Sequence, residues 1–90
     1  MRAALFPLGR VVATPGALAV LSPEEPLALL RRHQGGDWGE VPSDDARENE
    51  RSVKQGFRII SSYVAASGEK VWLITEADRS ATTLLLPSEY

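Results

Sequence analysis

After Gly56 the pattern of apolar positions changes from a helical period to a period of two, which is the pattern of β-strands. Residues 57–66 (FRIISSYVAA) and residues 70–77 (KVWLITEA) both follow it, and they flank Ser67 and Gly68. Serine and glycine between two β-prone segments indicate a tight turn. The pattern therefore predicts a β-hairpin in this part of the chain.

The two faces of the hairpin depend on the length of its turn. A two-residue loop at Ser67 and Gly68 pairs odd-numbered residues of the first strand with even-numbered residues of the second. One face would then carry Phe57, Ile59, Ser61, Tyr63, Trp72, Ile74 and Glu76, and the other Arg58, Ile60, Ser62, Val64, Val71, Leu73, Thr75 and Ala77. Both faces are largely apolar, so we expect the chain's own helices to cover one, and a partner subunit or a curled sheet to cover the other.

Two further segments favour strands. Residues 82–87 (TTLLLP) follow a predicted turn at residues 77–80 (ADRS), and they predict a third strand that ends at Pro87. Residues 9–14 (GRVVAT) are short and β-branched. They can add a fourth strand at an edge of the sheet.

The first half of the chain carries the signals of helix ends. Thr14 stands before a proline and is the predicted N-cap of a short helix over residues 15–21 (PGALAVL). Ser22 and Glu25 have the spacing of a capping box. This spacing predicts a second helix over about residues 23–33.

A third predicted helix covers residues 43–55 (SDDARENERSVKQ) and is mostly polar. Acidic residues begin it, and Gly56 is its expected left-handed stop. Its apolar seam consists of Ala46 and Val53, with Asn49 between them. We therefore expect most of this helix to face solvent.

Size and composition allow a single small domain. The chain has 90 residues, 43% of them hydrophobic and 24% charged, which is typical of a globular domain. The fold class predicted from these elements is α+β, with two or three N-terminal helices packed on an antiparallel sheet of three or four strands. The chain contains no cysteine, and no apolar run reaches the roughly 20 residues that cross a bilayer. We expect a cytoplasmic protein without a membrane segment.

The charge of the chain bears on its partners. The formal net charge of −2 gives no general attraction to phosphate backbones, so nucleic-acid contact would need a local basic patch. A hairpin that is apolar on both faces favours a protein partner or self-association instead.

The density of polar groups at residues 76–83 suggests a second interpretation, a metal-independent ribonuclease. His33 would act as general acid, Glu76 as general base, and Arg79 would neutralise the phosphorane, if all three meet in one cleft. Ser80 or Thr82 could assist. The simpler alternatives are a polar turn at these residues, where Arg79 pairs with a nearby carboxylate, and a protonated His33 that interacts with the dipole of its helix.

Five residues are candidates for binding: Trp38, Asn49, Asp78, Ser80 and Thr82. Trp38 lies in the glycine-rich loop GGDWG, where it can plug the core or line a site. Asn49 faces the sheet and must find hydrogen-bond partners, for which a strand-end carbonyl or the predicted ADRS turn are the candidates. The chain has no phosphate-loop or dinucleotide motif, and its single histidine gives no metal-ligand spacing, so we expect no metal and no cofactor.

Four segments in this order resemble a family of small bacterial proteins described as plasmid-related or hypothetical: GRVVATPGAL, LLRRHQGGDWG, ARENERSVKQG and VWLITEADRSATTLLLPSEY. The ending ITEADRSxTTLLLPxEY is the most specific part. The resemblance implies a link to bacterial mobile elements and a cytoplasmic setting, but it implies no mechanism. The layout of helices before a sheet is also similar to barnase-like and RelE-like ribonucleases, and this is an analogy of fold alone.

Two functions follow as hypotheses. The first is a protein-interaction or regulatory module associated with mobile elements. The alternative is a small ribonuclease that uses His33, Glu76 and Arg79.

Overall fold

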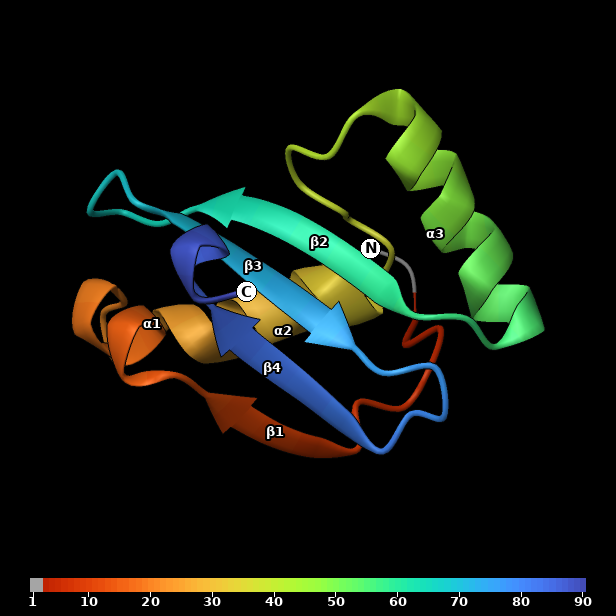
Figure 1. Ribbon diagram of the computed structural model, residues 1–90, viewed down its shortest axis with the longest axis horizontal. Helices are drawn as coiled ribbons and strands as arrows, with labels where there is room; N and C mark the ends of the chain where they lie inside the picture. Colours follow the sequence, from red (N-terminus) through yellow and green to blue (C-terminus); the bar gives the residue numbers. More distant parts are fainter. Residues whose placement is uncertain (1–2) are drawn as a thin grey trace.

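The computed structural model describes residues 3–90, in which helices pack on a four-stranded sheet (Figure 1). In chain order the elements are β1 (Arg10–Ala13), α1 (Pro15–Val20), α2 (Glu25–Gln34), α3 (Ser43–Gln55), β2 (Ile59–Val64), β3 (Lys70–Thr75), β4 (Ala81–Leu85) and the 3-10 turn η1 (Pro87–Glu89). The predicted α+β fold is confirmed. Within these residues, no helix is both long and apolar enough to cross a membrane.

The strands lie in the order β1-β4-β3-β2. The predicted meander is present, because β2 pairs with β3 and β3 with β4, both antiparallel. β1 is the expected edge strand, but it runs parallel to β4, with Arg10 opposite Ala81. The sheet is therefore mixed rather than antiparallel. Only a short hairpin forces antiparallel pairing, and the chain leaves β1 through the helices before it returns to the sheet.

Local side-chain chemistry sets the helix ends. The hydroxyl of Thr14 accepts a hydrogen bond from the Ala17 N–H at 3.1 Å, as the predicted N-cap of α1. α2 begins at Glu25, about two residues later than predicted, and the Glu25 carboxylate accepts from the Ser22 N–H at 2.8 Å. Gly56 has a φ of 80° and ends α3 in the left-handed conformation, as predicted.

The predicted register of the hairpin is wrong. Ile59 lies opposite Thr75, so odd-numbered residues pair with odd-numbered residues. The cause is the loop, because the Ala65 N–H donates to the Glu69 carbonyl and three residues lie between them instead of two. Gly68, with a φ of 91°, supplies the left-handed position that a three-residue loop requires. One extra loop residue moves every side chain of one strand to the opposite face relative to its partner.

The observed register gives the sheet two different faces. The face covered by α1 and α2 carries Ile59, Ser61, Tyr63, Val71, Leu73, Thr75, Thr82 and Leu84. The other face, here called the open face, carries Ile60, Ser62, Val64, Lys70, Trp72, Ile74, Thr83 and Leu85. In Figure 1, α2 passes behind the sheet, η1 lies in front of it, and α3 runs beside β2.

The core lies between the helices and the covered face and has two parts. The larger part consists of Ala17, Leu29, Leu30, Tyr63, Ala65, Val71, Leu73 and Leu84. The smaller part consists of Phe6, Trp38 and Ile59, against which Ala46 and Val53 of α3 pack. Trp38 is therefore a core residue, and its indole N–H donates to Glu50 at 3.0 Å. This packing fixes α3 beside β2.

Candidate functional site

His33 lies in the last turn of α2 and has an exposed fraction of 0%. Its Nδ1 lies 2.5 Å from the Ser61 hydroxyl oxygen, and its Nε2 lies 2.9 Å from the Thr75 hydroxyl oxygen. The Thr75 oxygen lies 2.7 Å from the Thr82 hydroxyl, which donates to the Leu8 carbonyl at 2.8 Å. Four buried polar side chains thus form one hydrogen-bonded row from α2 across β2, β3 and β4.

The direction of these hydrogen bonds follows from the number of hydrogens. The Thr82 hydroxyl gives its one hydrogen to a carbonyl, so it accepts from Thr75. Thr75 in turn accepts from the Nε2–H of His33. Nδ1 then carries no hydrogen and accepts from the Ser61 hydroxyl. These directions fit a neutral imidazole. If Nδ1 also carried a proton, this N–H and the Ser61 O–H would be two donors facing each other without an acceptor.

The surroundings of His33 also favour its neutral form. Burial, and to a smaller extent the charge of Arg79, lowers the pKa of His33 to about 4. The ring contacts Phe6 edge-on at a centroid distance of 5.2 Å and Trp38 at 6.0 Å. His33 is therefore a neutral core residue at pH 7, and the expected protonated interaction with the helix dipole is wrong.

Arg79 adopts a left-handed conformation with a φ of 61°. Its guanidinium donates to the carbonyls of Phe57 at 2.8 Å, Glu76 at 3.1 Å and Ser52 at 2.8 Å. The expected ion pair with a carboxylate is replaced by these three carbonyls. Arg79 thereby ties the end of α3 to the end of β3.

The turn between β3 and β4 is polar and exposed, as the sequence predicts. The Ser80 N–H donates to Asp78 Oδ1 at 3.0 Å, and hydrogen bonds from Ser80 lower the pKa of Asp78. The Glu76 side chain is exposed, while its N–H donates to the Ala81 carbonyl at 3.0 Å. Asp78 and Ser80 thus satisfy each other within the turn.

The ribonuclease hypothesis requires His33 and Glu76 to face the same cleft, and the structure does not place them so. Glu76 faces solvent, whereas His33 has no exposed surface and both of its ring nitrogens are bonded to hydroxyls. A general acid must reach the leaving group of its substrate within hydrogen-bond distance. In this structure a phosphate beside Glu76 or Arg79 would have no contact with His33.

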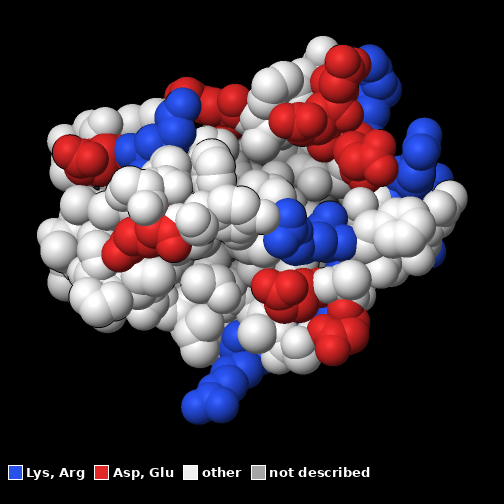
Figure 2. All heavy atoms as spheres, in the orientation of Figure 1, with Lys and Arg blue, Asp and Glu red and all other residues white. Residues whose placement is uncertain are grey.

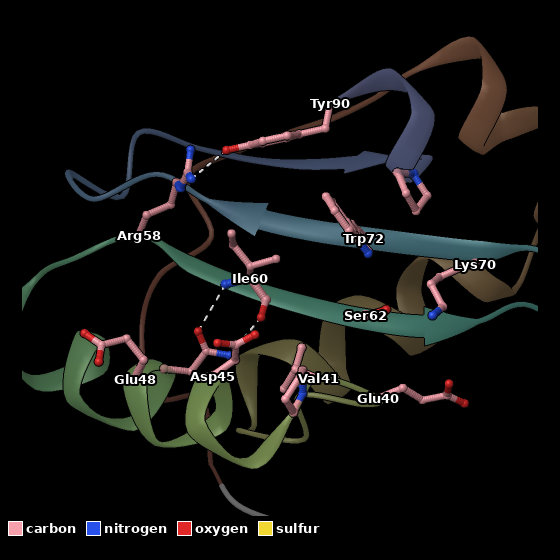
Figure 3. Close-up of a pocket in the computed structure, with 13 residues that line it drawn as sticks. Glu40, Val41, Asp45, Glu48, Arg58, Ile60, Ser62, Lys70, Trp72 and Tyr90 are labelled. Carbon is pink, nitrogen blue, oxygen red and sulfur yellow. Dashed lines mark hydrogen bonds between the residues drawn. The ribbon is translucent and has the colours of Figure 1, made fainter.

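A groove of about 700 Å³ lies on the open face, between α3 and the C-terminal turn (Figure 3). It is lined by Glu40, Val41, Pro42, Asp45, Glu48, Asn49, Arg58, Ile60, Ser62, Lys70, Trp72, Pro87 and Tyr90. In Figure 3, Ile60, Ser62 and Trp72 come from the strands of the floor, while Tyr90 and Asp45 approach from opposite sides. Its volume is in the range of about 300–1,000 Å³ that is usual for ligand sites.

Asn49 holds the α3 wall of the groove in place. Its side-chain Nδ2–H donates to the Ile60 carbonyl at 2.8 Å, and its Oδ1 accepts from the Ile60 N–H at 3.2 Å. The amide thus takes the place of a neighbouring strand at the outer edge of β2. The prediction that Asn49 bonds to a strand carbonyl is confirmed.

The loop before α3 continues this wall along β2. The Ser62 N–H donates to the Trp38 carbonyl at 3.1 Å, and the Ser62 carbonyl accepts from the Glu40 N–H at 2.7 Å. Gly39, between them, has a φ of 73°, and a Cβ atom there would collide with the Ser62 carbonyl. A glycine is therefore needed at this position.

The opposite wall is aromatic. The Tyr90 ring contacts Trp72 edge-on at a centroid distance of 5.6 Å, and the Tyr90 hydroxyl accepts from Arg58 at 2.6 Å. The Arg58 guanidinium also lies 5.5 Å from the centre of the Tyr90 ring. Tyr90 keeps 64% of its surface exposed, so an incoming molecule can contact it.

The charges around the groove are unevenly placed. Three carboxylates line the α3 side, those of Glu40, Asp45 and Glu48, and Figure 2 shows acidic side chains gathered over α3. Within residues 3–90, Glu40 and Asp45 have no ion-pair partner. The cations are Arg58, which is held by Tyr90, and Lys70. The α3 wall is therefore an acidic surface beside an apolar floor.

Sequence reasoning found only one residue of this groove, Asn49. It missed Ile60 and Trp72, because the expected register placed them on opposite faces. A three-residue loop, whose usual sign is a glycine at its third position, would have placed both on one face.

No family model matches the chain, and no curated protein or solved structure matches it significantly. In the part of the chain that the structure describes, no group of three or more His, Asp or Glu residues could hold a metal ion.

Proposed function

We propose that this protein is a protein-interaction module that binds a short segment of a partner protein in the groove of the open face. The segment would be extended, with an apolar or aromatic side chain for the floor and a basic side chain for the α3 wall. The observation that supports this most directly is an apolar floor beside the exposed Tyr90 ring, together with Glu40 and Asp45, which have no ion-pair partner within residues 3–90.

The floor supplies the apolar contact. Ile60 and Trp72 are each only partly buried, and Val41 contributes from the loop before α3. Aromatic side chains next to an apolar groove are the usual anchors of protein interfaces, because they bury a large area with few rotatable bonds.

The wall supplies selectivity for charge. Asp45 and Glu40 attract an arginine or lysine of the partner, and a cation between Asp45 and Trp72 could also interact with the face of the indole ring. A phosphate backbone would meet the same carboxylates as like charges. The groove therefore favours a basic peptide over a nucleic acid.

The resemblance to plasmid-related bacterial proteins supports a regulatory setting for such a module, in a bacterial cytoplasm and in association with mobile elements. The ribonuclease alternative gains no support from the geometry, because His33 is buried. We expect the purified protein to leave RNA intact, and RNA cleavage that is lost in His33→Ala would favour the alternative.

The peptide proposal can be tested by selection from a phage-displayed library of random heptapeptides. We expect enrichment of peptides that combine arginine or lysine with an aromatic residue. Binding of a selected peptide, measured by fluorescence polarisation, should weaken at least tenfold in Asp45→Lys. Asp44→Lys is the matched control, because Asp44 lies in the same first turn of α3 but does not line the groove.

Three results would contradict the proposal. They are an absence of enriched peptides, enrichment of acidic peptides, and equal effects of the two substitutions. Circular dichroism checks that both variants fold.

A further inference from the structure

The two edges of the sheet are treated differently. At the outer edge of β2, Asn49 bonds to both backbone groups of Ile60, and the loop at residues 38–40 bonds to both backbone groups of Ser62. Proteins cover an edge in this way to prevent the addition of another strand. Only Val64, at the far end of β2, lies beyond this cover.

The other edge, β1, has no such cover among the described residues 3–90. The N–H groups of Arg10 and Thr14 donate to the carbonyls of Ser80, just before β4, and Leu84 of β4, so the even-numbered residues along β1 direct their backbone groups into the sheet. The N–H and C=O groups of Val11 and Ala13 must then point away from it. Within residues 3–90, these four groups have no hydrogen-bond partner.

The side chains of β1 add an apolar surface to this free edge. Val11 is 44% exposed and Val12 is 39% exposed. Natural edge strands usually carry charges, prolines or bulges, and β1 has one charged residue, Arg10, at its first position. Figure 1 shows β1 at the margin of the sheet, with no other element beyond it.

We propose that β1 pairs antiparallel with β1 of a second copy of this chain and joins the two sheets into one of eight strands. A two-fold axis perpendicular to the sheet keeps the covered faces of both copies on the same side. Residues that lie opposite each other must share a face, so odd-numbered residues pair with odd-numbered residues.

One register uses all four free backbone groups. It places Val12 opposite Val12 of the second copy, and Val11 opposite Ala13 of the second copy. Val11 and Ala13 then exchange both of their hydrogen bonds across the interface, twice by symmetry. The two Val12 residues form the central pair that has no hydrogen bonds, where side chains approach most closely.

Charge complementarity selects a second copy over an unrelated strand. The same register places Arg10 opposite Thr14 of the second copy. The Thr14 hydroxyl donates to the exposed Glu89 carboxylate at 2.5 Å, and η1 lies over the open face to which Arg10 also belongs. Arg10 has no ion-pair partner within residues 3–90. Arg10 of each copy would therefore pair with Glu89 of the other copy. By symmetry two such ion pairs form, and the two Arg10 residues do not face each other.

β1 itself does not line the peptide groove, whose walls are α3 and the C-terminal turn. Four residues a side make a small interface, below the ~1,200 Å² of stable complexes. We therefore expect a weak dimer that is visible at high protein concentration.

Sedimentation equilibrium tests the dimer directly. The weight-average mass should rise from the monomer value of 9.8 kDa towards twice that value between about 10 μM and about 1 mM. Val12→Lys places two ammonium groups opposite each other and should abolish the rise. Val64→Lys is the matched control, because Val64 is an exposed valine on the same face at the other edge. If Val12→Lys fails to fold, Arg10→Glu serves instead, because it places the new carboxylate beside the Glu89 carboxylate of the second copy.

Cysteine crosslinking tests the register. The chain contains no cysteine, so Val12→Cys introduces a single thiol. In the proposed register the two Cα atoms lie about 4.5 Å apart, within the range of a disulfide. Mild oxidation should give a covalent dimer from Val12→Cys and little from Val64→Cys.

Several outcomes would overturn the proposal. They are a monomer at about 1 mM, a dimer that Val12→Lys leaves intact, and equal crosslinking at both positions. If β1 paired only with a strand of another protein, this protein would remain a monomer at about 1 mM, which is the first of these outcomes.

Discussion

Acidification should destabilise this protein at a pH where few carboxylates titrate, because its one histidine is buried in the neutral form. The pKa of His33 falls from an ordinary value of 6.5 to about 4 in the folded protein. The unfolded chain therefore binds a proton at a higher pH than the folded chain does. Stability is fully present above about pH 6.5, and it declines as the pH falls towards 4.

The magnitude follows from the difference between the two pKa values. At about 1.4 kcal/mol for each pH unit, a difference of about 2.5 units costs about 3 kcal/mol by pH 4. At pH 5 the loss is already about 2 kcal/mol. The lowered pKa values of Glu25, Asp37, Asp78 and Glu89 add their own losses, but these begin near the ordinary carboxyl values of 3.8 and 4.5. Between pH 7 and pH 5 the histidine dominates.

Two measurements check this prediction. Urea unfolding at a series of pH values should give a free energy of unfolding that falls by about 2 kcal/mol from pH 7.5 to pH 5. His33→Gln should lack most of this fall. An NMR titration of the single histidine in the wild-type protein gives its pKa without any variant. A midpoint between pH 6 and 7 would refute the reasoning about the hydrogen-bonded row.

Substitutions at three positions test α3 and the loop before it by the same urea unfolding. Asn49→Ala leaves the N–H and C=O of Ile60 without their partner and should lower the free energy of unfolding by about 2–4 kcal/mol. Asn49→Asp keeps the acceptor for the Ile60 N–H and should lower it less. Equal losses in the two variants would contradict the role of both hydrogen bonds. Ser52→Ala removes a buried hydroxyl that has no hydrogen-bond partner within residues 3–90 and should leave stability unchanged or raise it by about 1 kcal/mol, so a clear loss would count against this description. Gly39→Ala should cost more than about 2 kcal/mol, because its Cβ would meet the Ser62 carbonyl, and a neutral effect would show that the loop is less closely held.

Local chemistry made the elements of the fold predictable. Thr14 caps α1, Gly56 ends α3 and Gly68 lies in the hairpin loop, and each acts through neighbours a few residues away. Such interactions are visible in a sequence because the partners are close along the chain.

The buried site was not predictable in the same way, because it depends on register. The expected two-residue loop placed Ser61 and Thr75 on opposite faces, so the hydroxyl row was hidden. With the observed loop, Ser61, Thr75 and Thr82 share the face that α2 covers, and His33 of α2 meets them there. One extra residue in the loop thus decides whether Ser61 and Thr75 can share a face and bind the same histidine.

The parallel pairing could not be read from the sequence either. Nothing in residues 9–14 distinguishes a parallel from an antiparallel neighbour, since both take short β-branched strands. The partner of Arg10 lies about 70 residues away, at Ala81.

That separation bears on how the molecule forms. The hairpin contacts of β2, β3 and β4 close short stretches of chain, whereas β1 can dock only after β4 is in place. Closing so long a segment carries a larger entropic cost and slows folding. The strand with the free edge is thus expected to arrive late in folding and to open first, so the amide hydrogens of Val12 and Thr14 should exchange with solvent before those of β3.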